Sequence, residues 1–335
     1  MKASIVIGSY NEGEYLGWTI THVARALPPD CEIIVVDDCS TDGSGEMALE
    51  AVERLGPDAP DVCITRPGAR LGVAAGRNRG VEHASGDYVV FLDAHSAPMS
   101  GDWLTRLLQP LEDDENVAIA APAYLSIPEM TWADHVAGVI PNPPSPEAYW
   151  KMLRDGANVS YGRGCRMQVE NDVLCSKWMP PLASTRPHRI QIAKGGCMAM
   201  RTEDFRSWGG FDTGLTWPWG WDDDEMSLRA WRLGYSVVSV PRAHVGIVYR
   251  SENSYGGAGM SNRGHLRSSL RTAIRLFSWR RVEHLIQSAA HWSTLPSIMT
   301  ELMRSDVMDE RAAIEAASPI DSLDHIWDEF GDWME

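Results

Sequence analysis

The feature that most constrains the fold of this chain is a short apolar run that ends in an acid and a histidine. Residues 89–92 read Val-Val-Phe-Leu, and Asp93, Ala94 and His95 follow directly. A four-residue apolar run closed by turn residues is typical of a buried strand in a parallel sheet. The ligand crevice of an open α/β sheet lies at the carboxyl ends of such strands. Asp93 and His95 point to the same side there, because side chains alternate along a strand. For this tripeptide alone, a site for a divalent metal such as manganese and a simple surface turn are equally compatible.

Strand and helix patterns alternate on the N-terminal side of this run. Apolar strands are predicted at residues 3–7, 32–36 and 62–64, and helices are predicted at residues 15–27, at residues 44–55 and from residue 72 onward. This alternation predicts a parallel sheet with right-handed crossovers. We therefore expect an α/β fold in which polar residues at the strand ends form the site.

Composition excludes several classes of protein. The 335 residues include 46 acidic and 30 basic side chains, so the net charge is −16. No basic footprint for a nucleic-acid partner is visible. No apolar run approaches the ~20 residues of a membrane-spanning helix, so we expect no integral membrane contact. The six cysteines are scattered without a Cys-x-x-Cys pair, and no secretory leader pattern precedes the first strand. These observations predict a cytoplasmic enzyme with reduced thiols.

Four segments of the N-terminal half carry a family resemblance. They are residues 9–12 (Ser-Tyr-Asn-Glu), 35–42 (Val-Val-Asp-Asp-Cys-Ser-Thr-Asp), 75–80 (Ala-Gly-Arg-Asn-Arg-Gly) and 86–93 (Gly-Asp-Tyr-Val-Val-Phe-Leu-Asp). In this order they resemble the nucleotide-sugar half of GT-A glycosyltransferases, family 2 in particular. The resemblance implies that Asp38 meets the nucleobase, expected to be uracil, and that Ser9 and Glu12 line the same pocket. It also implies that Arg77 lies near the diphosphate of a UDP-sugar.

The Asp-x-His sequence departs from the Asp-x-Asp that family 2 usually carries. Followed by a Trp-Leu helix, it is similar to the catalytic domain of polypeptide N-acetylgalactosaminyltransferases. This resemblance implies that Asp93 and His95 bind Mn²⁺ (or Mg²⁺) together with the diphosphate, where a divalent ion neutralises the charge of the leaving UDP. The third metal ligand of those enzymes aligns with Ile247, which cannot bind a metal. His244, three residues earlier, is the candidate third ligand, with a structural histidine as the alternative.

Two further segments resemble the same enzymes. Gly195 and Gly196 let the backbone come close to a ligand, and the resemblance implies that they lie against the donor sugar. Residues 219–231 read Trp-Gly-Trp-Asp-Asp-Asp-Glu-Met-Ser-Leu-Arg-Ala-Trp, and they resemble the segment that carries the catalytic acids.

In inverting family 2 enzymes the second acid of this pair is the general base toward the acceptor hydroxyl. The resemblance therefore implies catalytic roles for Asp222 and Asp223, and it implies that Trp219 belongs to the donor site. Asp224 is expected only to suit the helix dipole. The retaining polypeptide transferases have Asn at the position of Asp223, so His95 favours retention of configuration whereas Asp223 favours inversion.

The remaining resemblance lies in a glycine-rich segment near residue 250. Arg250 matches the polypeptide transferases in place, and residues 251–263 resemble the loop that closes over UDP in that family. Glycines and serines between two ordered elements suit such a lid. We expect Arg250 and this loop to stabilise the leaving UDP.

The sequence predicts one catalytic domain and an extension. Residues 1–263 are expected to form the GT-A domain, with a Rossmann-like nucleotide-sugar half (1–116), an acceptor half with the lid loop (117–263) and a mixed central sheet. Residues 264–335 are expected to form a helical C-terminal extension that is unlike a lectin domain. Its first helix is basic and amphipathic. We expect this helix to pack on its own domain, with binding to a membrane surface as the alternative.

Taken together, the resemblance predicts a metal-dependent glycosyltransferase that moves a hexose or N-acetylhexosamine from a UDP-sugar to an acceptor hydroxyl. The acceptor class is predicted to be Ser or Thr of a protein or peptide, with a polysaccharide or lipid-linked acceptor as the alternative. A sugar-phosphate nucleotidyltransferase is a further alternative, but residues 8–13 contain neither the arginine nor the lysine that would grip a triphosphate. A non-catalytic carbohydrate-binding protein is disfavoured by the acids at positions 93, 222 and 223.

Overall fold

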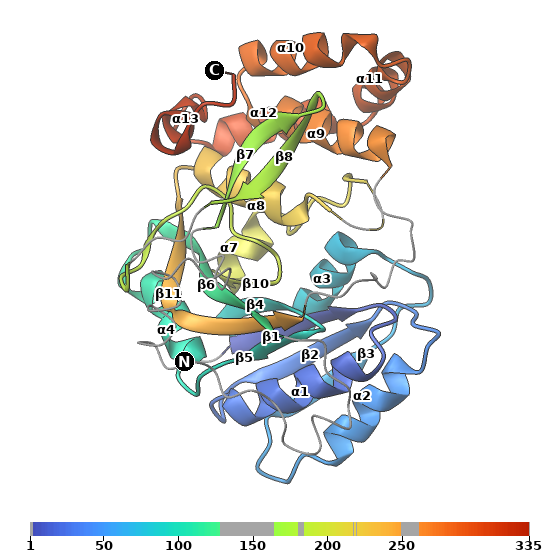
Figure 1. Ribbon diagram of the computed structural model, residues 1–335, viewed down its shortest axis with the longest axis vertical. Helices are drawn as coiled ribbons and strands as arrows, with labels where there is room; N and C mark the ends of the chain where they lie inside the picture. Colours follow the sequence, from blue (N-terminus) through green and yellow to red (C-terminus); the bar gives the residue numbers. More distant parts are fainter. Residues whose placement is uncertain are drawn as a thin grey trace.

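The computed structural model describes residues 3–127, 164–179, 184–216, 218, 220–248 and 261–334. Within these ranges the main element is a nine-stranded mixed sheet in the order β3-β2-β1-β4-β10-β6-β11-β5, with β9 paired to β11. The predicted α/β class with a mixed central sheet is confirmed. Figure 1 shows the sheet crossing the lower half of the molecule, with the C-terminal helices above it.

The N-terminal half is the predicted parallel unit. Its strands are β1 (Ala3–Ser9), β2 (Glu32–Asp37), β3 (Asp61–Thr65) and β4 (Tyr88–Asp93), and its helices are α1 (Glu14–Ala26), α2 (Ser44–Glu53) and α3 (Val73–Glu82). All neighbouring pairs among these four strands are parallel, with β1 between β2 and β4. The carboxyl ends of β1, β2 and β4 therefore lie along one edge, as the sequence predicts.

A glycine sets how closely α3 can approach this sheet. A Cβ placed on Gly80 would lie 2.3 Å from Cγ1 of Val6 and 3.3 Å from Cγ2 of Val36. The absence of a side chain at this position thus lets the helix backbone rest directly on β1 and β2. This contact explains the last glycine of the Gly-Arg-Asn-Arg-Gly segment, and it places the preceding turn of α3 near the strand ends.

The second half of the sheet is mostly antiparallel. Its strands are β5 (Ser96–Pro98), β6 (Val117–Ile127), β9 (His188–Arg189), β10 (Cys197–Arg201) and β11 (Ser236–Val248). β10 pairs antiparallel with β4, so Cys197 lies opposite Leu92 and the turn before β10 meets the end of β4. β11 runs parallel to β6 with a register shift between Val240 and His244.

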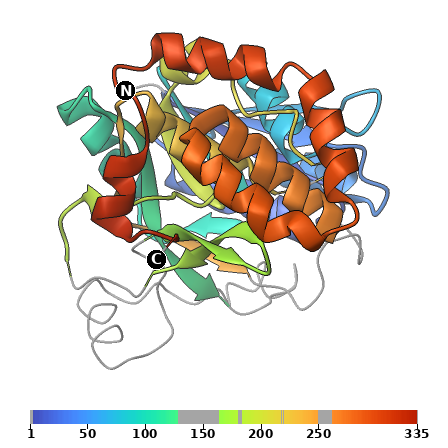
Figure 2. The ribbon, with the colours of Figure 1, turned by 90° about the horizontal axis from the view of Figure 1, so that it is seen from above.

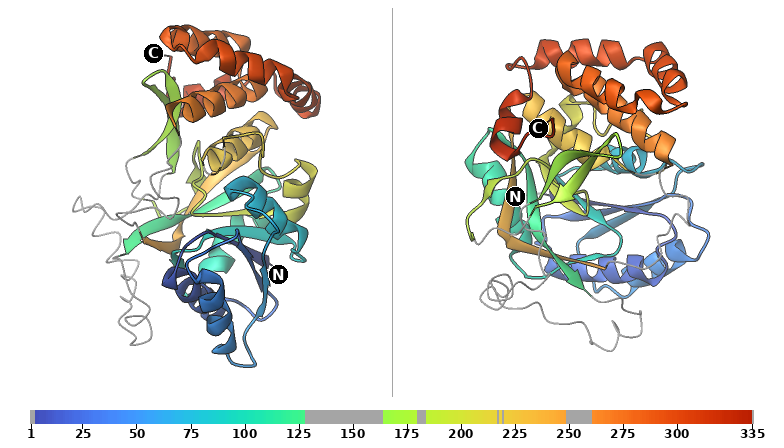
Figure 3. Two further views of the ribbon diagram at one scale, coloured as in Figure 1. Left: turned by 90° about the vertical axis from the view of Figure 1, so that its right-hand side faces the viewer. Right: turned by 45° about the horizontal axis from the view of Figure 1, so that its top comes forward.

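Both faces of β4 are buried, which explains its uninterrupted apolar sequence. Val90 and Leu92 pack with α1 and with α4 (Trp103–Asp113) on one face. Val89 and Phe91 pack on the other face with α7 (Thr202–Ser207) and α8 (Asp222–Arg232). Helices on both faces of a largely parallel sheet are the expected consequence of such a run. The left view of Figure 3 shows α8 between the sheet and the C-terminal helices.

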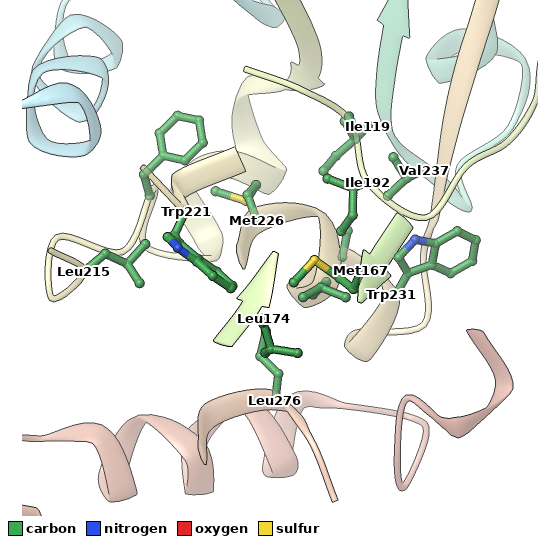
Figure 4. Close-up of a cluster of buried hydrophobic side chains, with 14 of the residues drawn as sticks. Ile119, Met167, Leu174, Ile192, Leu215, Trp221, Met226, Trp231, Val237 and Leu276 are labelled. Atoms are coloured by element: carbon green, nitrogen blue, oxygen red, sulfur yellow. The ribbon is translucent and has the colours of Figure 1, made fainter. Parts of the chain in front are cut away.

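The C-terminal region is helical, as predicted. It comprises α9 (Asn262–Leu276), α10 (Trp279–Ser288), α11 (Leu295–Arg304), α12 (Val307–Ala317) and α13 (Asp324–Phe330). Seen from above in Figure 2, these helices lie over the sheet and beside the hairpin of β7 (Cys165–Glu170) and β8 (Val173–Trp178). Their apolar side chains join the same core as α8, where Leu276 faces Leu174 (Figure 4).

Buried ion pairs tie α9 to α8 and to Asp212. Arg271 donates two hydrogen bonds to Asp212, at 2.8 and 2.9 Å. Arg275 bonds Asp212 at 2.9 Å and Glu225 of α8 at 2.6 Å. The Arg271 side chain is 2% exposed and that of Arg275 is 6% exposed, so these two arginines face the protein. The expectation that the basic helix packs on its own domain is confirmed.

Two predictions from composition were examined in the described parts of the chain. All six cysteines are unpaired thiols, in agreement with the expectation of reduced cysteines. None of the helices in the described ranges is both long and apolar enough to cross a bilayer. The cytoplasmic location stays a prediction.

Candidate active site

A cavity of about 440 Å³ opens at the carboxyl end of β4. Three segments that are far apart in the sequence form its polar wall: the end of β4, the turn before β10 and the first turn of α8. Seven of the predicted site residues line it, namely Arg77, Asp93, His95, Gly195, Gly196, Asp222 and Asp223. The fold therefore brings together residues that the sequence places in four separate segments.

Asp93 and His95 form the predicted pair on this wall. Nε2 of His95 lies 3.9 Å from Oδ2 of Asp93. Nδ1 of His95 lies 3.2 Å from Oε2 of Glu12. A carboxylate on Nδ1 fixes the tautomer of an imidazole and leaves Nε2 as the metal-binding atom. Glu12, predicted to line the nucleotide pocket, instead contacts His95 in the structure.

His244 does not lie in this cavity, so the prediction that it supplies the third metal ligand is wrong. In the described ranges no three His, Cys, Asp or Glu side chains are grouped closely enough to hold a metal ion. β11 continues without a register shift from His244 to Val248, and side chains alternate along a strand. His244 and Ile247 are three residues apart and consequently face opposite sides. Ile247 lines the cavity, and His244 does not. His244 is buried elsewhere, and this burial lowers its pKa.

Arg77 is the cation that links three segments of the site. Its guanidinium lies 2.6 Å from Oδ2 of Asp222, 3.1 Å from Oδ1 of Asp93 and 2.7 Å from the carbonyl oxygen of Gly195. A Cβ on Gly195 would stand 2.7 Å from the guanidinium, so a glycine is needed for this close approach. The alternative that Arg77 is a helix-surface arginine is excluded, since the residue is 5% exposed.

The two predicted catalytic acids have different electrostatic surroundings. Burial, assisted by the neighbouring Asp223, raises the pKa of Asp222 to about 6 against the opposing effect of Arg77. Burial alone would raise the pKa of Asp223 as well, but Lys194 and the N–H of Gly195 hold it below its ordinary value. Asp223 is therefore the acid of this pair that has the lower pKa. Trp221, which precedes the acids, has a φ of 75°, and such strain in a non-glycine residue is concentrated at functional sites.

Lys194 and Asp224 are site residues that the sequence reasoning missed. Nζ of Lys194 lies 3.1 Å from Oδ1 of Asp224 and 3.1 Å from Oδ2 of Asp223. Both residues line the cavity, so the expectation that Asp224 merely suits the helix dipole is wrong. The available signal was a lysine directly before Gly195 in an otherwise apolar segment, because a buried lysine requires an acidic partner.

The predicted nucleobase end lies beside the cavity, at the ends of β1 and β2. Asp38 accepts hydrogen bonds from the N–H groups of Leu71 and Gly72, at 2.6 and 2.8 Å. The carbonyl of Ser9 accepts one from the N–H of Asp38 at 2.8 Å. Asp38 thereby anchors the loop that leads into α3. Trp219, Arg250 and residues 251–260 of the predicted lid lie outside the described residues. Asn262 and Arg263, which were also predicted to belong to the lid, are the first residues of α9.

The comparisons with known proteins agree with this geometry. The model of glycosyl transferase family 2 matches residues 4–174, which is about half of the chain. The chain belongs to glycosyltransferase family 2. A second model, described as the N-terminal domain of galactosyltransferase, matches residues 184–254 of this family 2 chain. The predicted enzyme class is confirmed at the level of the glycosyltransferase family.

Similar curated proteins are N-acetylgalactosaminyltransferases of animals. Polypeptide N-acetylgalactosaminyltransferase 11 of Xenopus tropicalis is 31% identical over 270 residues, which are 77% of this chain and 40% of that protein. Probable N-acetylgalactosaminyltransferase 7 of Caenorhabditis elegans is 28% identical over 257 residues, which are 75% of this chain and 39% of that protein. The chain thus spans about two fifths of the length of these relatives.

Solved structures confirm the predicted GT-A fold. GalNAc-T7, solved with UDP, GalNAc and Mn²⁺, has a TM-score of 0.71 at 20% identity and covers 98% of this chain and 57% of its own. The mannosyltransferase PcManGT from Pyrobaculum calidifontis, solved with GDP-Man and Mn²⁺, has a TM-score of 0.54 at 18% identity. It covers 98% of this chain and 78% of its own.

Proposed function

We propose that this family 2 glycosyltransferase transfers a hexose or N-acetylhexosamine from a UDP-sugar to an acceptor hydroxyl with the help of Mn²⁺ or Mg²⁺. The observation that carries the proposal is the arrangement of the cavity wall, in which Asp93 and His95 stand beside Arg77 and the acids of α8. The donor assignment is supported by GalNAc-T7, which was solved with UDP, GalNAc and Mn²⁺.

The residues present fit a divalent ion. Asp93 offers a carboxylate and His95 an imidazole whose Nδ1 is already engaged by Glu12, and this donor set suits manganese. Two protein ligands leave further coordination positions for phosphate oxygens of the donor. When bound, the ion would neutralise negative charge on the leaving UDP.

We propose that the nucleoside of the donor binds at the other end of the site, at the carboxyl ends of β1 and β2. Asp38 and Ser9 are proposed to hold the uracil end of the donor, supported by their position at the carboxyl ends of β2 and β1. Gly195 and Gly196 are proposed to lie against the sugar, since neither carries a side chain that would narrow the cavity. Trp219 and Arg250 retain their proposed roles at the donor through the family resemblance alone.

Asp223 is proposed as the general base. The hydrogen bond from Gly195 at 2.8 Å and the lowered pKa keep its carboxylate ionised and oriented. A carboxylate in reach of the acceptor hydroxyl contributes ~10²–10⁴-fold to the rate. Its role as base corresponds to inversion at the anomeric carbon, and NMR of the product distinguishes inversion from retention.

The acceptor is proposed to be a Ser or Thr hydroxyl of a protein or peptide. The support is that similar proteins are named polypeptide N-acetylgalactosaminyltransferases. We assign residues 1–263 to the catalytic domain and residues 264–335 to the helical extension, whose first helix shares buried ion pairs with Asp212 and Glu225.

Thermal unfolding with UDP and Mn²⁺ tests the donor and metal assignments. UDP is expected to raise the melting temperature when Mn²⁺ is present and not in EDTA, because ligands stabilise the folded state by mass action. Asp93→Ala should abolish the rise. Asp113→Ala, which removes an exposed acid from the end of α4, should retain it. A melting temperature that no nucleotide raises in the presence of metal would refute the proposal.

A further inference from the structure

The ammonium group of Lys194 is engaged by the cavity wall. An ammonium has three N–H donors. Nζ of Lys194 lies 2.9 Å from Oγ of Ser176 on β8, 3.1 Å from Oδ1 of Asp224 and 3.1 Å from Oδ2 of Asp223. Two hydrogen bonds, to Ser176 and Asp224, and an ion pair with Asp223 therefore hold the ammonium against the cavity wall.

The position of Lys194 links three parts of the site. It directly precedes Gly195 and Gly196, and its partners come from the β7–β8 hairpin and from the first turn of α8. The hydroxyl of Tyr124 lies 2.5 Å from the Lys194 carbonyl and holds this turn from the sheet side. Together with the N–H groups of Gly195 and Asp224, which donate to Asp223 at 2.8 and 2.9 Å, the Lys194 side chain fixes the direction in which the Asp223 carboxylate points.

The charges around Asp223 make this contact important. Asp222 and Asp224 stand on either side of Asp223 in the chain and disfavour a third negative charge. Arg77, whose guanidinium bonds Asp222 at 2.6 Å, and Lys194 are the cations that face Asp223, and the Cys165 thiol also lies within its electrostatic reach. His265 lines the same cavity, where burial lowers its pKa. Lys194 is the cation in direct contact with Asp223.

We propose that Lys194 is a positioning residue that keeps Asp223 ionised and aimed at the acceptor. This inference rests on the proposed function, in which Asp223 is the base. In that step the acceptor O–H bond breaks and its proton passes to the Asp223 carboxylate. The acceptor oxygen forms a bond to the anomeric carbon, and UDP leaves with the electron pair of the broken glycosidic bond. Lys194 keeps its proton throughout, since Asp223 and Asp224 raise its pKa above the ordinary value despite burial.

The consequence is that Lys194 determines how the reaction rate depends on pH. With Lys194 in place, Asp223 remains a carboxylate well below neutral pH. Without it, the adjacent carboxylates and burial would raise the pKa of Asp223, and a protonated acid cannot accept the hydroxyl proton. The rate should then fall on the acidic side while remaining closer to that of the parent enzyme at alkaline pH.

The test is the pH profile of UDP release from UDP-N-acetylgalactosamine with Mn²⁺ and a threonine-containing peptide, measured between pH 5 and 9. Lys194→Met is expected to move the acidic limb of kcat/KM upward by about one pH unit or more, which is about a tenfold loss at the lower pH values. Lys194→Arg should keep the parental profile, because it retains the positive charge. Lys177→Met, which removes a half-exposed lysine from β8, is the matched control and should leave the profile unchanged.

The outcomes separate the two proposals. If the parent enzyme releases no UDP, or if Asp223→Asn is as active as the parent, the proposed function fails and the inference fails with it. If the parent is active but Lys194→Met lowers the rate by one factor at every pH, or not at all, the role of Lys194 alone is overturned. The thermal shift by UDP and Mn²⁺ shows whether Lys194→Met is folded. Should it be unfolded, Lys194→Gln takes its place with the same expected profile.

Discussion

The substitution Ile247→His should place a new metal ligand beside Asp93 and His95, the two ligands that we propose among the described residues. Ile247 lies on the cavity wall with Asp93 and His95. A Cβ placed on Gly196 would lie 2.7 Å from Cδ1 of Ile247 and 3.5 Å from Oδ2 of Asp93. The end of the isoleucine side chain and the carboxylate therefore converge on one point. An imidazole at position 247 would project toward the same carboxylate.

The expected magnitude has two opposing parts. Ile247 is 6% exposed, and burial of such a side chain contributes about 1.5–3 kcal/mol, so the metal-free variant should be destabilised by about that amount. Changes in groups that merely support a ligand alter metal affinity about 10–100-fold. A new direct ligand should tighten binding by at least as much, which is about 1.4–2.7 kcal/mol of additional stabilisation in excess metal.

The assay is thermal unfolding in EDTA and in saturating Mn²⁺, with calorimetric titration of Mn²⁺ for the affinity itself. Ile247→Leu is the control, because it conserves volume and apolar character without adding a ligand. Ile247→His should melt below Ile247→Leu in EDTA and show the larger rise with Mn²⁺. An equal rise in both variants would refute the reasoning that Ile247 stands where a ligand belongs.

Two further predictions concern carboxylates. Glu12→Gln should weaken Mn²⁺ binding about 10–100-fold, because Glu12 fixes His95 through Nδ1; titration of Mn²⁺ measures this, and the exposed neighbour in Glu14→Gln should leave the affinity unchanged. The hydrogen bonds from Arg281 lower the pKa of Asp332 to about 2, so this pair stabilises the fold above about pH 4 and the contribution is lost as the pH falls toward 2. Asp332→Asn should flatten that part of the stability curve by about 1 kcal/mol after solvent screening, as measured by urea unfolding from pH 2 to 6. The same curve for parent and variant would contradict the assignment.

Local patterns were sufficient to predict the parallel half of the fold. When strands and helices alternate with short connections, only a few sheet topologies are possible for the chain. The run 89–92 is apolar throughout because both faces of β4 are covered, and this is visible in the sequence. The end of that strand then correctly indicated where the cavity would open.

The site was predicted less completely, because its contacts join distant positions. The Glu12–His95 contact spans 83 residues, and that between Lys194 and Asp224 spans 30, so neither leaves a local signal. His244 was wrongly predicted as a metal ligand, although its separation from Ile247 in the sequence already argued against that role. An odd separation from Ile247 within one continuous strand places the two side chains on opposite faces.

The ion pairs of α9 also have a consequence for the order in which the molecule is made. Arg275 follows Glu225 by 50 residues and Asp212 by 63. The chain is made from its N-terminus, so both carboxylates leave the ribosome well before this arginine. Glu225 meets Arg229 within α8, but its second ion pair, with Arg275, has to wait for α9. We therefore expect the buried carboxylates of Asp212 and Glu225 to be fully paired only when residues near 275 have emerged.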